Sequence, residues 1–259
     1  MNRSLTIFSW LLWQELRVFF QRFFGNLIDA LIFPLAEVLV ASYILPLMGI
    51  SAIFGSFILV GITISMCLFH CVNKAQSLVA DIEISNNISY QLSLPLPAWL
   101  LFLKIGLSFA ITSAFLNFLT IPIGKIFLGN LFDLSAMSIP KMVLIFVTLN
   151  IFFGFYGLLV ASLVKKTSYF SHVWMRFVLP LWMLGGYQYS WYTLKNAYPF
   201  FGLLTLLNPL LYAFEGIRAA ALGPNGSINF WLSFIMLWIF IGIFYWYALL
   251  KFKQRLDYV

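Results

Sequence analysis

The sequence predicts an all-α membrane protein, built as a single transmembrane domain over residues 1–259. Six membrane-spanning helices are expected, with an interfacial amphipathic helix at the N-terminus and an external re-entrant helix before the last span. Composition is the first reason: 63% of the residues are hydrophobic and only 9% are charged, whereas soluble domains carry about 25% charged residues. The second reason is that the apolar runs are continuous, unlike the alternating pattern of a β-barrel.

Residues 1–25 are predicted to form the interfacial helix. Between residues 4 and 23, Leu and Phe recur near helical spacing, while Gln14, Arg17 and Gln21 line another face. A basic amphipathic helix of this kind rests in the headgroup plane of the membrane. The alternative is a cytoplasmic extension of the first span.

Six apolar runs of about 20 residues follow, each long enough to cross a hydrocarbon core of about 30 Å. They cover residues 26–47, 52–72, 99–123, 141–164, 169–187 and 229–250. Three polar or irregular segments separate them, at 73–98, 125–140 and 188–227.

Basic residues set the expected orientation, because Lys and Arg collect on cytoplasmic loops. One side of the predicted topology has ten of them: Arg3, Arg17, Arg22, Lys74, Lys104, Lys165, Lys166, Lys251, Lys253 and Arg255. The other side has four: Lys125, Lys141, Lys195 and Arg218. We therefore expect both termini in the cytoplasm, and the net charge of +7 calls for no nucleic-acid partner.

The segment 208–223 is predicted to be a short, fully capped helix. Asn208 is a favourable N-cap, and Pro209 follows at the first turn, where a missing N–H costs nothing. Glu215 and Arg218 lie three residues apart, so they share a face and can pair. Gly223 ends the helix.

A helix of about 15 residues is roughly 22 Å long, too short to cross a bilayer. We therefore predict a re-entrant helix inside the external region 188–227, packed on protein because irregular backbone is not tolerated against lipid. The hypothesis is an external gate that opens during transport, formed by Asn208, Pro209, Tyr212, Glu215 and Arg218. The alternative is a static plug.

Two charges fall inside apolar runs. Glu37 and Arg176 both lie roughly 15 Å from the predicted cytoplasmic side, where an isolated charge costs at least ~2.5 kcal/mol. One interpretation pairs them across the first and fifth spans. The other buries each one separately against backbone carbonyls or water.

Catalytic and cofactor motifs are missing from the sequence. No Gly-x-x-x-x-Gly-Lys-Ser/Thr phosphate-binding loop occurs, and no Ser/His/Asp set is recognisable. Cys67, His70 and Cys71 are close in sequence, but we expect small thiols packed between helices rather than a metal site. The chain is therefore expected not to be an enzyme and to hold no cofactor or metal of its own.

Two segments resemble the ABC-2 type exporter permeases. One is the Asn-Pro, Tyr, Glu, Arg and Gly series within 208–223. The other is Asn86-Asn87-Ile88-Ser89-Tyr90-Gln91-Leu92-Ser93-Leu94-Pro95-Leu96-Pro97, which is similar to a family segment reading Gly-Thr-Leu-Glu-x-Leu-Leu-x-(Ser/Thr)-Pro-Leu. Asn86-Asn87 stands for Gly-Thr, and Ser89 stands for the acidic residue. With the six-span plan the resemblance covers nearly the whole chain, and it is nearest to the drug, Nod-factor and polysaccharide export branch.

The resemblance implies a function and its partners. The cytoplasmic loop 73–98 would form a coupling helix that docks on a separate ATPase subunit, with the site residues Asp81, Glu83, Asn87, Tyr90, Leu92 and Pro95. That subunit would bind ATP and Mg²⁺, and two copies of the chain would enclose a path in the bacterial inner membrane. The cargo would be an amphiphilic drug, a lipid or a glycan. The competing hypothesis is a proton-coupled secondary transporter that uses Glu37.

Overall fold

The computed structural model describes residues 2–85 and 87–256. Every regular element within them is helical, which confirms the predicted all-α class. The longer α-helices are α1 (Asn2–Gln21), α2 (Phe23–Leu39), α3 (Phe54–Ala80), α5 (Ala98–Asn117), α7 (Ile139–Leu163) and α13 (Phe230–Leu256). The shorter ones are α4 (Asn87–Ser93), α6 (Thr120–Leu128), α8 (Phe170–Val173), α9 (Leu179–Met183), α10 (Trp191–Ala197), α11 (Pro199–Thr205) and α12 (Pro209–Ala221).

Short π and 3-10 segments join these helices. The π segments are η1 (Val40–Ile44), η3 (Asp81–Ser85) and η6 (Trp174–Val178). The 3-10 segments are η2 (Leu45–Met48), η4 (Gly129–Leu131) and η5 (Thr167–Tyr169).

Five helical segments are long and apolar enough to cross a membrane. They are Phe23–Met48, Phe54–Ser85, Ala98–Leu131, Ile139–Leu163 and Phe230–Arg255, and they match the first four and the last of the six predicted runs. The protein is therefore an integral membrane protein by the length and composition of its helices. The remaining predicted run, 169–187, has a different structure.

That run contains a helix from Phe170 to Met183 with a π segment in its middle. Its length is about 14 residues, or roughly 21 Å, which is shorter than a hydrocarbon core of about 30 Å. Pro180 explains the π segment. Its nitrogen has no hydrogen to donate to the carbonyl one turn earlier, and its ring displaces that carbonyl. Past Met183 the chain continues in irregular structure, so the predicted fifth span is only partly helical.

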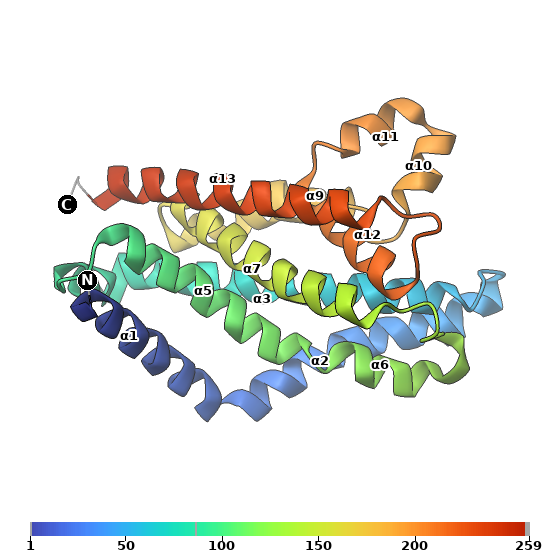
Figure 1. The fold of residues 1–259 in the computed structure, drawn as a ribbon, viewed down its shortest axis with the longest axis horizontal. Coiled ribbons are helices and arrows are strands. Elements are labelled where there is room, and N and C mark those ends of the chain that lie inside the picture. The colour runs from blue at the N-terminus through green and yellow to red at the C-terminus, as the bar shows by residue number, and fades with distance from the viewer. Residues whose placement is uncertain (1, 86, 257–259) are drawn as a thin grey trace.

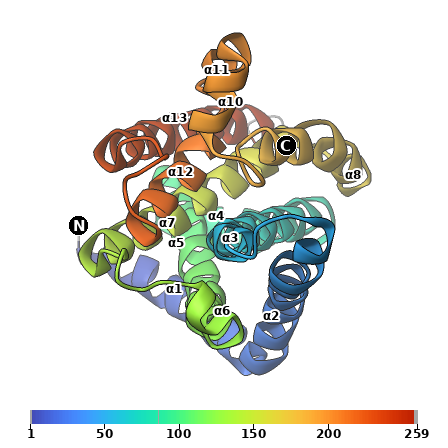
Figure 2. The ribbon, with the colours of Figure 1, turned by 90° about the vertical axis from the view of Figure 1, so that its right-hand side faces the viewer.

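The helices form a bundle with α3 and α7 at its centre (Figures 1 and 2). The helix α7 packs against α3, α5, α12 and α13, and α3 also packs against α2. We call the end where α1 begins, α4 lies and α13 ends the inner end (Figure 1). The opposite end, where α7 and α13 begin, is the outer end. The predicted orientation would place the inner end in the cytoplasm.

Glycines bring the central helices close together. A Cβ atom on Gly154 of α7 would collide with the backbone oxygen of Gly106 in α5. A Cβ atom on Gly157 would lie 2.6 Å from the backbone oxygen of Cys71 in α3. Small residues at such crossings let membrane helices approach backbone to backbone, so α7 is held between α5 and α3.

The predicted interfacial helix is α1, which meets α2 at a sharp angle (Figure 1). It packs on α5, where the rings of Phe20 and Phe115 are in contact. Leu11 and Phe19 are buried, while Trp10 and Trp13 are exposed. In an amphipathic helix of this kind, one face packs on protein and the other faces solvent or lipid.

Candidate functional site

The first predicted site lies at the inner end, around α4. Asp81 fixes the start of this helix: its carboxylate accepts from the Asn87 side-chain amide at 2.7 Å and from the Ile88 backbone N–H at 3.2 Å. A carboxylate in this position satisfies a donor that a helix start leaves without a partner. Asn86 lies outside the described residues, as does the side chain of Ser89.

Glu83 connects this region to the loop before α8. Its carboxylate accepts from the Thr167 backbone N–H at 2.8 Å and from the Thr167 hydroxyl at 2.6 Å. Hydrogen bonds to a charged acceptor are stronger than neutral ones. The two inner connections, 81–97 and 164–169, are therefore linked directly, which the sequence did not predict.

Lys104 is a site residue that sequence reasoning missed. We expected a lysine on the cytoplasmic side, but its side chain is 0% exposed. Its ammonium forms an ion pair with Glu15 of α1 and donates to the Gln91 side chain of α4 at 3.0 Å. Three elements, α1, α4 and α5, therefore meet on one buried cation. Its place inside an apolar run was the available signal, because a buried charge requires a partner and Glu15 is the only acidic residue in 1–25.

The rest of the predicted coupling residues divide into exposed and packed positions. Tyr90 is 68% exposed, and Ile84 at the end of η3 is 75% exposed. Leu92 packs against the hydrophobic core instead. Pro95 is exposed, and its carbonyl accepts from the Ser4 hydroxyl at 3.3 Å. Ile84 and Tyr90 are therefore the large apolar side chains that this region exposes.

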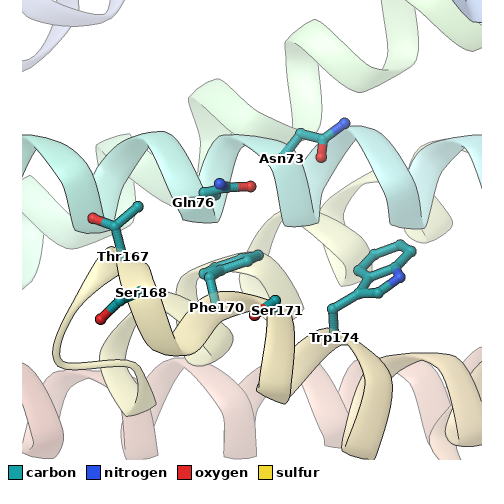
Figure 3. A pocket seen from close by; sticks show the side chains of 7 residues that line it. All are labelled: Asn73, Gln76, Thr167, Ser168, Phe170, Ser171 and Trp174. Atoms are coloured by element: carbon teal, nitrogen blue, oxygen red, sulfur yellow. The ribbon is translucent and has the colours of Figure 1, made fainter.

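A cavity of about 370 Å³ opens beside the Glu83–Thr167 connection. Figure 3 shows side chains from α3 on one side and from the segment running from η5 into η6 on the other. Apart from two aromatic rings, all its lining side chains are amides or hydroxyls. The lining residues are Asn73, Gln76, Thr167, Ser168, Phe170, Ser171 and Trp174.

The second predicted site is α12, and its predicted caps are confirmed. The Asn208 side chain accepts from the Leu210 backbone N–H at 3.0 Å, and Pro209 is the first helical residue. Gly223 has a positive φ of 93° just past the helix, a conformation that favours glycine. The bend of 97° between α11 and α12 is that of a broken span or a re-entrant loop.

Arg218 is almost completely buried and is bound mainly by backbone. Its guanidinium donates to the carbonyls of Gly186 at 2.6 Å, Tyr187 at 2.7 Å and Tyr189 at 3.1 Å. Its plane lies 3.6 Å from the ring centroid of Phe57, which is a cation–π distance. Arg218 therefore attaches α12 to the irregular segment that follows α9.

Glu215 completes this connection from the same face of α12. Its carboxylate lies 3.6 Å from the Arg218 guanidinium, so the predicted pairing of these two residues is confirmed. It also accepts from the backbone N–H of Trp191 at 3.1 Å and of Ile228 at 2.9 Å. Glu215 and Arg218 therefore bind α12 to the chain on both of its flanks.

The helix α12 is enclosed by its own chain. Every residue from Leu210 to Ala221 is buried, and α12 packs against α3, α7 and α13. Gly216 lies against Ile145 of α7 and Ser233 of α13, and the Tyr212 hydroxyl donates to the Leu206 carbonyl at 2.9 Å. The small residues of α12 thus face helices of the same chain, which favours the static plug over the moving gate.

The structure does not bring Glu37 and Arg176 together. Glu37 is half-buried, and its carboxylate accepts from the Tyr187 hydroxyl at 3.1 Å. Arg176 is exposed on η6 and has no ion pair among the described residues. The predicted pair is therefore wrong for a single copy of the chain, because Tyr187 supplies the partner that Glu37 needs.

The thiols and the nearby histidine have partners of their own. Cys67 and Cys71 are free and buried, and the Cys71 thiol lies 3.8 Å from the Phe109 carbonyl. The His70 ring nitrogen lies 3.0 Å from the Thr112 hydroxyl. These contacts place the three side chains in helix packing between α3 and α5.

No family model, curated protein or solved structure matches this chain. The observations above define its class as an all-α integral membrane protein. Its particular activity has to be argued from its own residues, since a fold alone does not fix a function.

Proposed function

We propose that this protein is the membrane-spanning subunit of an ATP-driven exporter of the ABC-2 type, in a bacterial cytoplasmic membrane with both termini inside. Two copies would act with a separate ATPase subunit and move an amphiphilic substrate, a lipid, drug or glycan, out of the cytoplasm. The resemblance in 86–97 and in 208–223 supports the family. The bundle adds an observation that bears on the coupling step.

That observation is the arrangement of hydrogen bonds that fixes α4. A helix of seven residues lies between two membrane-crossing segments, capped by Asp81 and bound through Gln91 to the buried Lys104. It nevertheless exposes Tyr90, and the adjoining η3 exposes Ile84. Fixed helices with exposed apolar side chains are surfaces on which partner proteins dock.

The hydrogen bonds and the ion pair around α4 provide a path by which a movement of α4 can reach other helices. A displacement of α4 would be transmitted to α1 and α5 through Lys104. A displacement of η3 would be transmitted to the start of α8 through Glu83 and Thr167. Chains of packed and bonded side chains of this kind can carry coupling between distant sites. Because the chain lacks a phosphate-binding loop, ATP and Mg²⁺ would bind to the partner subunit.

A proton-coupled secondary transporter is the second candidate. The hydrogen bond between Glu37 and Tyr187 favours it, because a half-buried carboxylate with one polar neighbour could exchange a proton during transport. That candidate predicts transport without any ATPase and its loss when an uncoupler removes the proton gradient.

Co-purification with the ATPase subunit tests the proposal. The ATPase for this test would be sought among the products of neighbouring reading frames, as one with a phosphate-binding loop. Changing Tyr90→Asp together with Ile84→Asp should abolish its co-purification, because two charges would enter an apolar contact surface. The matched control is Tyr198→Asp, since Tyr198 is 62% exposed but lies in the external region.

The two results lead to different conclusions. Loss with the inner pair and retention with the control would support the docking surface on α4. Retention of the complex with both variants, with normal membrane insertion, would contradict it. Transport that survives removal of the ATPase and stops with an uncoupler would favour the secondary transporter.

A further inference from the structure

Two further cavities meet at one lysine near the inner end. A cavity of about 750 Å³ lies between α1, α3, α4 and α5, and a second of about 350 Å³ lies between α2, α3 and α5. Asn26, Lys74 and Ser77 line both of them. Asp81, Asn87 and Tyr90 of the predicted coupling segment also line the larger cavity, but docking of a partner on that segment does not require a cavity behind it.

The charge of Lys74 interacts with that of Glu15, which also lines the larger cavity. The Lys74 side chain is half-buried, and no hydrogen bond or ion pair to it occurs among the residues that the structure describes. Arg22, at the joint between α1 and α2, lines the larger cavity with it. Two cations therefore face one hollow with their donors free for a ligand.

The carboxylates that line the two cavities offset these cations only in part. Glu15 is paired with the buried Lys104, and Asp81 is occupied by two donors of α4. Asp29 lines only the smaller cavity and is exposed, so water screens its charge. Because Glu15 is paired with Lys104, the two cations Lys74 and Arg22 face only the Asp81 carboxylate in the larger cavity, which leaves an excess of one positive charge.

The remaining lining contains both polar and apolar side chains. Asn26 and Ser77 offer neutral polar groups next to Lys74. Leu11, Val18, Phe19, Ile105 and Phe109 add apolar side chains. A ligand with a charged head and an apolar tail fits this combination.

The depth of Lys74 also points to a lipid. Lys74 lies six residues before the end of α3 at Ala80, roughly 9 Å along the helix axis at 1.5 Å per residue. The headgroup region of each leaflet is roughly 5–7 Å thick, given the difference between the full bilayer and its hydrocarbon core. If the end of α3 at Ala80 is taken as the membrane surface, the Lys74 ammonium lies where phosphates and the first methylene groups of a phospholipid meet.

We propose that this cavity binds an anionic phospholipid, with the phosphate held by Lys74 and Arg22 and an acyl chain along Val18 and Phe19. The bound lipid fills the space between α1, α3 and α4. Since Asp81 and Gln91 in the same wall hold α4, the lipid steadies that helix. This role does not depend on which cargo the protein moves or on how the transport is driven.

Binding of short-chain phosphatidylglycerol to the full chain in an uncharged detergent tests the proposal. Native mass spectrometry and lipid-dependent thermal stabilisation are the two readouts. Lys74→Gln should weaken binding about tenfold, the factor that corresponds to one lost charged hydrogen bond. Lys74→Arg should retain binding, because it keeps the charge. Lys166→Gln is the matched control, since Lys166 is exposed at the inner end and lines neither cavity.

Two outcomes would overturn the proposal. Equal weakening by Lys74→Gln and Lys166→Gln would indicate attraction to surface charge rather than a site, and equal binding of phosphatidylcholine with the same chains would show that charge does not select the ligand. A third measurement distinguishes the source of the phosphate. Inorganic phosphate should not displace the lipid, and full displacement at millimolar concentration would overturn the assignment to a lipid.

Discussion

The carbonyl groups that bind Arg218 cannot be predicted from helical spacing in the sequence. Spacing predicted that Arg218 would share a face with Glu215, because residues three apart on a helix are neighbours. The three carbonyls that it binds belong to the irregular segment 186–189. Their position depends on how that segment folds over α12, which a local pattern cannot specify. Lys104 is a similar case, since its partners come from α1 and α4.

Removing the Arg218 side chain should destabilise the outer end strongly. Arg218→Met would leave three carbonyls without their side-chain donor and the Glu215 carboxylate without its ion-pair partner, and removal of one partner of a buried pair costs about 3–5 kcal/mol. Arg218→Lys should recover only part of this loss, because an ammonium cannot present the planar fork. The free energy of unfolding in detergent measures both.

Arg176→Ala is the control for this prediction. Arg176 is an exposed arginine without an ion pair among the described residues, so its loss should change the free energy of unfolding by about 0.5 kcal/mol or less. A cost for Arg176→Ala equal to that of Arg218→Met would contradict this account of the outer end.

A double-mutant cycle distinguishes the two partners considered for Glu37. Glu37→Gln and Tyr187→Phe should show a coupling energy of about 1.5–3 kcal/mol, the range for a hydrogen bond to a charged group. Glu37→Gln with Arg176→Gln should show none. Coupling in the second cycle but not in the first would restore the predicted pair, with the two residues meeting between copies of the chain.

At the scale of elements, hydrophobic runs predicted the long helices well and the interrupted ones poorly. All but the end residues of the runs 52–72 and 141–164 lie in α3 and α7, because about 20 continuous apolar residues favour a membrane helix whatever they pack against. The run 169–187 instead contains a π segment and an irregular end. The π segments η1 and η6 both lie just before a proline, Pro46 and Pro180. The prolines were visible in the sequence, but which distortion the packing selects was not.

The crossing of α5 and α7 depends on the absence of a side chain at Gly154. Gly154→Ala should reduce the free energy of unfolding by about 1–3 kcal/mol, the usual cost of overpacking, because its methyl group would meet the backbone of Gly106. Gly242→Ala on α13 is the matched control, since no atom lies within 4 Å of the added methyl group. That change should be neutral or stabilising by up to about 1 kcal/mol. Equal destabilisation by both variants would contradict the close crossing.

At the scale of the whole molecule, the two ends of the bundle differ in how they are built. The inner end joins α1, α3, α4 and α5 through charged side chains around hollows. The outer end encloses α12 and binds both of its flanks through Glu215 and Arg218. Regions with cavities and exposed polar contacts open at lower free energy than enclosed cores. Any motion during transport should therefore begin at the inner end, while α12 moves as one body with α7 and α13.

Cysteine labelling tests this behaviour of α12 in a background without Cys67 and Cys71. Ala213 and Ala220 are 0% exposed, so cysteines there should not react with an impermeant external thiol reagent, either at rest or during ATP turnover by the proposed complex. A cysteine at the exposed Asn225, just past the same helix, should react in both states and controls for access. Labelling of the two buried positions that rises with turnover would show that α12 moves as a gate. Reaction of Asn225→Cys only from the cytoplasm would reverse the orientation that the basic residues predict.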